Sequence, residues 1–163
     1  MPITTNPVAS NAAAADASVL LPTRAELIER LADHVPVADQ RPAALVIVGL
    51  LRRDDSWPIP GGVLGRLTQL FAGSIRGDDW LARSGPTEFA FVLGGPATTA
   101  GAAATRLVAA VSAEGIPGMS AAAGIAALAP DATAGELHRR ATLCLAAARS
   151  IGGGQVITYS GTR

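Results

Sequence analysis

The chain has 163 residues, and its 13 Lys or Arg residues balance 13 Asp or Glu residues, so the formal net charge at pH 7 is zero. That balance argues against a protein whose main partner is a polyanionic nucleic acid or an anionic membrane surface. The best apolar run, residues 43–51, has the length of a strand and not of a membrane span. A single cysteine, Cys144, excludes an internal disulfide and fits a reducing compartment, so we expect a cytoplasmic location.

The N-terminal half predicts a tail, a helix and a strand. Residues 1–18 are rich in small and polar residues without a hydrophobic period, which predicts a disordered tail ahead of one domain, residues 19–160. Thr23 and Glu26 match a capping box, and the apolar residues that follow predict a helix ended by Pro36. The unbroken apolar residues 43–51 predict a strand covered on both faces, in the middle of a sheet.

The remaining elements alternate between helices and strands. Apolar spacing predicts helices over residues 63–75, 98–114 and 133–151, the last one opened by a capping box at Thr133 and stopped by glycines 152–154. We expect Leu137, Leu143, Leu145 and Ala148 to face inward on that last helix. Residues 119–128 and 155–159 predict two further strands.

A hairpin is predicted over residues 80–84 and 87–93, joined at Gly85-Pro86. Arg76 and Asp79 stand just ahead of its first strand, where a scaffold can present side chains to a ligand. An antiparallel hairpin set among crossover helices predicts an α/β sandwich with a mixed sheet.

Side chains suited to acid, base or metal chemistry are scarce. His34 and His138 lie on predicted helices beside polar neighbours, so we interpret both as solvated surface residues. Cys144 lies among apolar residues and is expected to be a buried small hydrophobe. The glycines at 61, 62 and 65 lack the Lys-Ser/Thr of a phosphate loop, and helix entry explains them. The sequence therefore predicts no catalytic residue, no metal site and no cofactor.

The order and spacing of several short motifs resemble a GGDEF domain, the family of bacterial diguanylate cyclases that condense two GTP molecules into cyclic di-GMP. The resemblance covers about residues 16–156, and it implies a palm-like α/β sandwich with a central, largely antiparallel five-stranded sheet flanked by helices, with the signature on a β-hairpin. The matching residues are Asp16, Leu21, Pro22, Arg24, Gly61, Gly65, Arg140, Ala141 and Gly152, with Arg83 and the signature hairpin Ser84, Gly85, Pro86, Thr87, Glu88 and Phe89.

The chain departs from active members at the positions that hold magnesium. In those members an aspartate at the end of the first strand and an acidic residue third in the signature bind the ions, and the aligned residues here are Gly49 and Thr87. Glu88 remains, but one carboxylate cannot hold two ions. The resemblance therefore implies an inactive cyclase.

The GTP-binding positions also differ. The guanine-reading asparagine and aspartate align with Trp57 and Arg66, and the second signature glycine aligns with Pro86. The two phosphate-holding cations of the last helix align with Arg149 and Gly153, so one charge remains.

The inhibitory site of the family is an Arg-x-x-Asp ahead of the signature, where cyclic di-GMP binds. Arg76 and Asp79 match it, and Arg83 and Arg106 are candidates for a second arginine. A guanidinium can contact guanine and a phosphate in bidentate fashion, while a carboxylate accepts from the base. A solvated ion pair between Arg76 and Asp79 is the alternative interpretation.

The leading hypothesis is a catalytically inactive domain that binds cyclic di-GMP and passes its occupancy to an unidentified protein partner. A nucleotide-independent interaction or dimerisation module, including a homodimer, is the main alternative. A GTP-binding regulatory domain and an active diguanylate cyclase remain further alternatives.

Overall fold

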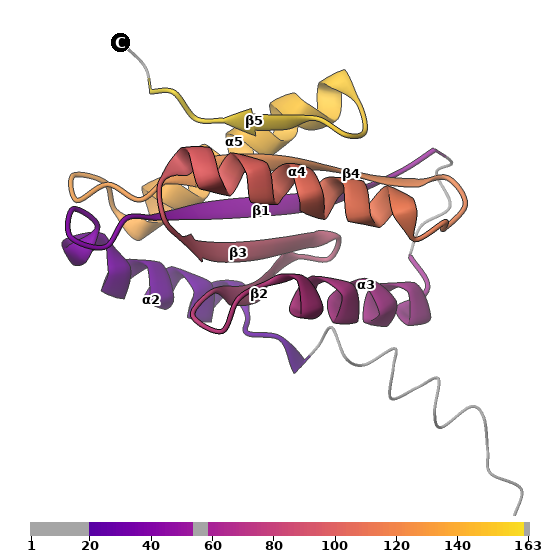
Figure 1. Cartoon of the computed structure of the whole chain (residues 1–163), viewed down its shortest axis with the longest axis horizontal. Coiled ribbons are helices and arrows are strands. Elements are labelled where there is room, and N and C mark those ends of the chain that lie inside the picture. The colour runs from indigo at the N-terminus through magenta and orange to yellow at the C-terminus, as the bar shows by residue number, and fades with distance from the viewer. Residues whose placement is uncertain (1–19, 54–58, 162–163) are drawn as a thin grey trace, which may run out of the picture.

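The computed structural model describes residues 20–53 and 59–161, which form a five-stranded sheet with helices on both faces (Figure 1). The predicted tail, residues 1–18, and the aligned residues Asp16 and Trp57 lie outside the described residues. The elements in chain order are α2 (Arg24–His34), the 3-10 helix η2 (Val35–Val37), β1 (Ala43–Arg52), α3 (Gly61–Ser74), β2 (Trp80–Gly85), β3 (Glu88–Gly94), α4 (Ala97–Ala113), β4 (Met119–Ala127), α5 (Ala134–Ile151) and β5 (Val156–Thr158).

The central strand is β1, as its unbroken apolar sequence predicts. The strand order is β2-β3-β1-β4-β5, and β1 pairs antiparallel with both β3 and β4. Only the β4–β5 pair is parallel among the described strands, so the sheet is mixed and largely antiparallel. The predicted fold class is confirmed.

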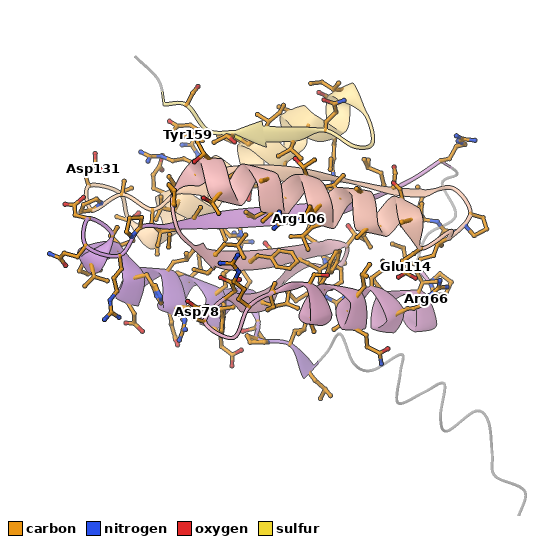
Figure 2. All side chains as sticks on the ribbon, in the orientation of Figure 1. Arg66, Asp78, Arg106, Glu114, Asp131 and Tyr159 are labelled. Atoms are coloured by element: carbon orange, nitrogen blue, oxygen red, sulfur yellow. The ribbon has the colours of Figure 1, made fainter. Side chains whose placement is uncertain are left out.

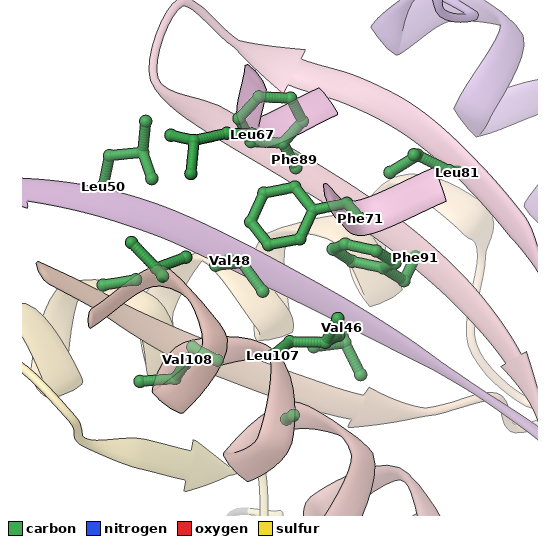
Figure 3. Close-up of a cluster of buried hydrophobic side chains, with 14 of the residues drawn as sticks. Val46, Val48, Leu50, Leu67, Phe71, Leu81, Phe89, Phe91, Leu107 and Val108 are labelled. Carbon is green, nitrogen blue, oxygen red and sulfur yellow. The ribbon is translucent and has the colours of Figure 1, made fainter. Parts of the chain in front are cut away.

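Alternate side chains of β1 enter two separate cores. Val46 and Val48 pack with α3 and α4 on one face of the sheet, and Leu45 and Ile47 pack with α2 and α5 on the other. Figure 3 shows the first core around Phe71 of α3. Its ring meets the rings of Phe89 and Phe91 edge-on, with centroids 4.9 and 5.3 Å away. These contacts hold α3 directly over the hairpin strand β3.

Two helix starts were predicted from capping boxes. At α2 the full box forms, because the Thr23 hydroxyl accepts from the Glu26 amide at 3.3 Å and the Glu26 carboxylate accepts from the Thr23 amide at 2.7 Å. At α5 the Thr133 hydroxyl accepts from the Glu136 amide at 3.1 Å. The Glu136 carboxylate, however, forms ion pairs with Arg139 and Arg140 on the helix surface and not the predicted hydrogen bond with the Thr133 amide.

The small residues of β4 allow a helix to lie directly on the strand. A Cβ atom built on Gly124 would collide with the backbone of α5 at Ala141 O and Leu145 N. Glycine is therefore required for this close approach, and the neighbours of Gly124 on the same face of β4, Ala122 and Ala126, have small side chains as well. This packing explains why an Ala-rich segment forms a strand despite its low strand propensity.

Two expectations for α5 are wrong. The buried stripe of α5 runs through Leu137, Ala141, Leu145 and Ala148, which leaves Leu143 on the outer face with 52% of its surface exposed. His138, expected at the surface, is 6% exposed because it follows Leu137 onto the edge of the same stripe. Within the described ranges, no helix is both long and apolar enough to cross a membrane.

Candidate functional site

A pocket opens between the end of α3, the end of β3 and one side of α4. Its cavity volume is about 350 Å³. Arg76 and Asp79 enter it from the turn before β2, and Arg106 enters from α4; Figure 2 labels Arg106 and the neighbouring Asp78. The other lining residues are Ser74, Ile75, Leu93, Gly94, Thr99, Ala100, Ala103, Leu107 and Ala110. The pocket thus combines two cations and one carboxylate with a largely apolar wall.

Asp79 closes the turn that presents Arg76. Its carboxylate accepts from the Arg76 amide at 3.0 Å and from the Gly94 amide at 3.2 Å, and its own amide donates to the Arg76 carbonyl at 3.1 Å. The expected alternative, an ion pair between the two side chains, is not among the contacts of the described residues. Each Asp79 oxygen keeps a second lone pair that can accept from a ligand.

Arg83 lies elsewhere. Its side chain donates to the carbonyls of Gly85 at 3.2 Å and Pro86 at 3.0 Å, so it holds the turn of the signature hairpin. Its backbone amide donates to the Pro22 carbonyl at 2.9 Å, which ties the segment before α2 to strand β2. The structure brings Arg76, Asp79 and Arg106 together at the pocket and leaves Arg83 outside its lining.

The residues beside the signature hairpin are arranged differently. Gly49 of β1 stands opposite Glu88 of β3, and the carbonyl of Thr87 accepts from the Leu50 amide at 2.9 Å. Glu88 forms an ion pair of 3.1 Å with Arg149 of α5. The space above Gly49 is filled by the same arginine, because a Cβ built there would lie 2.7 Å from its Cζ.

These residues do not fit the magnesium ions that the resemblance associates with the hairpin. Divalent magnesium requires carboxylate and other oxygen ligands, and here the one carboxylate faces a guanidinium. Across residues 20–53 and 59–161, no three His, Cys, Asp or Glu side chains gather in a group that could hold a metal ion.

A second link joins the hairpin to α5. The Ser84 hydroxyl and His138 Nε2 share a hydrogen bond of 2.9 Å, and both residues are buried. Burial lowers the pKa of His138 below its ordinary value of 6.5, and the positive charge of Arg24 lowers it further, while Glu88 opposes the shift. Cys144 is buried, as the sequence predicts, and burial raises the pKa of its thiol.

Two of the aligned GTP positions have other roles. Arg66 of α3 forms an ion pair with Glu114 at 2.9 Å and also donates to its carbonyl at 2.9 Å, which joins α3 to the end of α4 (Figure 2). Gly153 lines a second hollow of about 420 Å³ beyond the end of β1, together with Arg52 and Arg53. Arg149 turns to Glu88, so the two aligned phosphate positions are directed to different places.

Sequence reasoning missed the two links between the hairpin and α5. Ser84 and His138 are 54 residues apart, and Glu88 and Arg149 are 61 residues apart. No local spacing signals such pairs. The helical period of α5 could have indicated that His138 lies on the buried side.

Comparisons with protein-family models and with curated proteins each found no match. The GGDEF domain of DgcB from Caulobacter crescentus, solved in complex with c-di-GMP, is similar in structure, with a TM-score of 0.75, 17% identity and coverage of 86% of this chain and 92% of that chain. The FimX GGDEF domain from Pseudomonas aeruginosa has a TM-score of 0.70, 25% identity and coverage of 84% and 94%. The active GGEEF domain of a diguanylate cyclase from Vibrio cholerae has a TM-score of 0.75 and 21% identity, and the match covers 87% of this chain and 99% of that chain. The predicted resemblance is confirmed at the level of the fold.

Proposed function

We propose that this chain, whose fold is that of GGDEF domains, is a receptor for cyclic di-GMP without diguanylate cyclase activity. The observation that carries the proposal is the pocket where Arg76, Asp79 and Arg106 converge from two elements that are separate in sequence. Within the described part of the chain, neither Arg76 nor Arg106 has a carboxylate partner, so both guanidinium groups are available to an anionic ligand.

The chemistry of the pocket suits a cyclic dinucleotide. A guanidinium can bind a phosphate or the Hoogsteen edge of guanine through two parallel hydrogen bonds. Ala100, Ala103 and Leu107 give a purine an apolar surface, and Asp79 has acceptor capacity left for the N–H groups of guanine. Two solved GGDEF neighbours, one of them DgcB, are in complex with c-di-GMP, which supports this choice of ligand.

The charges beside the signature hairpin do not suit cyclase chemistry. Phosphoryl transfer with two metal ions needs several anionic ligands near the reacting phosphates. Gly49 and Thr87 supply none, and Glu88 already faces Arg149. We expect purified protein incubated with GTP and Mg²⁺ to form no cyclic di-GMP, and formation of the product would refute this part of the proposal.

Calorimetric titration of cyclic di-GMP tests the receptor. We expect binding by the wild type and at least about a tenfold loss in Arg76→Ala, because hydrogen bonds to a charged group contribute about 1.5–3 kcal/mol. Arg139→Ala is the matched control, since Arg139 is an exposed arginine of α5 that does not line the pocket. Flat heats with the wild type would refute the receptor, and a parallel GTP titration would identify a GTP-binding regulatory domain.

One observation favours a second candidate, a nucleotide-independent docking module. Leu143 and Ile151 of α5 are 52% and 65% exposed, and a spacing of eight residues places them on one side of the helix. If cyclic di-GMP does not bind, sedimentation velocity should show self-association that Leu143→Ser abolishes. A monomer at all concentrations would count against the homodimer.

A further inference from the structure

Arg149 lies beside the signature hairpin, against Gly49 and Glu88. Gly49 and Glu88 face each other across β1 and β3, and the last turn of α5 brings Arg149 over both. A Cβ built on Gly49 would lie 2.7 Å from Arg149 Cζ and 2.8 Å from its Nε, which is closer than real Cβ contacts occur. The guanidinium therefore takes the volume that a longer side chain at position 49 would occupy.

The same guanidinium provides the charge that Glu88 requires. Arg149 Nη1 lies 3.1 Å from Glu88 Oε1, and the two side chains are only 28% and 22% exposed. A partly buried carboxylate is stabilised by a counterion or by several hydrogen-bond donors. One planar cation provides the counterion and fills the space above a glycine.

We infer that the Arg149 guanidinium takes the place of a metal ion beside the hairpin, balances the charge of Glu88 and holds the signature hairpin against α5 without any ligand. The inference rests on one part of the proposed function, namely that the hairpin residues do not hold metal ions. It does not depend on ligand binding at the Arg76 pocket. Its consequence is that carboxylates restored at positions 49 and 87 would still bind metal poorly, because the guanidinium repels a divalent ion and pairs with the new acid.

Manganese binding, followed by electron paramagnetic resonance of free Mn²⁺, tests this consequence. The Gly49→Asp, Thr87→Asp double variant is compared with a triple variant that also carries Arg149→Ala, and with one that carries Arg139→Ala instead. We expect the Arg149→Ala triple variant to bind Mn²⁺ at least about tenfold more tightly than the other two. Equal affinity in all three, or no Mn²⁺ binding in a folded Arg149→Ala triple variant, would overturn the inference.

A double-mutant cycle on the otherwise unchanged chain covers the case in which those variants do not fold. Arg149→Ala and Glu88→Gln are made singly and together, and the denaturant midpoint of unfolding is measured. We expect the shift caused by Arg149→Ala to fall to less than about half once Glu88→Gln is present. Additive shifts would show that the two side chains do not support each other and would overturn the inference. Titration of the same variants with cyclic di-GMP reports separately on the proposed receptor.

Discussion

The pocket at Arg76 and the ion pair at Glu88 contain the same kinds of side chain in different arrangements. In the pocket, Asp79 accepts from two backbone amides, and the nearby guanidinium groups line a cavity. At the ion pair, Glu88 faces the Arg149 guanidinium, which also fills the space above Gly49. The partner of the carboxylate decides whether the arginine remains available, so an arginine beside an acid in the sequence does not by itself identify a ligand site.

The largest expected effect is on the packing of α5 against the sheet, which positions Arg149 beside Glu88 but does not build the Arg76 pocket. Gly124→Ala places a methyl group against the α5 backbone at Ala141 and Leu145, and we expect it to lower the free energy of unfolding by about 2 kcal/mol. Gly101→Ala in α4 is the matched control, because a Cβ there meets nothing within 4 Å and should raise stability by about 0.5–1 kcal/mol. Urea unfolding measures both, and equal destabilisation by the two would contradict the close α5–β4 contact.

The second prediction concerns the turn that carries Arg76. Asp79→Ala removes the acceptor of two backbone amides, and we expect a loss of about 1–2 kcal/mol in unfolding free energy. The exposed neighbour Asp78 offers the control, since Asp78→Ala should change stability by less than about 0.5 kcal/mol. Similar losses in both variants would mean that Asp79 does not hold the turn.

The third prediction concerns the α4 wall of the pocket. Arg106→Ala should weaken cyclic di-GMP binding by about tenfold while the free energy of unfolding stays within about 0.5 kcal/mol of the wild type, because its side chain is exposed. Calorimetry beside the Arg76→Ala variant measures the effect. Unchanged affinity in Arg106→Ala would place the ligand on the Arg76 side of the pocket alone.

The smallest expected effect is on pH dependence at the hairpin–α5 link. The folded-state pKa of His138 is lowered by burial, so its neutral form contributes stability that is fully present above the unfolded pKa of about 6.5 and is lost as the pH falls through the folded pKa. His138→Gln keeps a hydrogen-bonding group for Ser84 and cannot take up the proton, so stability should fall less between about pH 7.5 and about pH 5.5. His34→Gln is the control, and the free energy of unfolding of both variants is measured by urea unfolding across this pH range. An equal dependence on pH in the two variants would show that His138 does not cause the effect.

The fold follows from the sequence wherever an element carries its own signal. The capping box at Thr23 and the unbroken apolar run of β1 were enough to place a helix and a central strand. The strand β4 was predictable as well, although the reason that its alanines suit a strand appears only when α5 is seen lying on Gly124. Local patterns thus predicted the elements, and packing explains their composition.

The candidate site was predictable only in part. Arg76 and Asp79 are close in sequence. Of the two candidates for a second arginine, Arg83 and Arg106, the fold brings only Arg106 to the same pocket. The pairing of Glu88 with Arg149 depends on how α5 crosses the sheet, and no spacing along the chain encodes that crossing. Leu143 was wrongly expected to face inward, because that prediction used its apolar character and not its angular position on the helix relative to Leu137, Ala141 and Leu145.

The position of β1 also has a consequence for biosynthesis. One of its partners, β3, follows soon after it in the chain, whereas the other, β4, begins only at Met119. Until β4 has left the ribosome, the edge of the nascent β1 that will pair with β4 has no partner, and the strand is apolar except for Arg52 at its end; such edges can pair with other chains. Completion of the sheet therefore requires a late pairing between segments far apart in the chain, and contacts of large sequence separation slow folding in general.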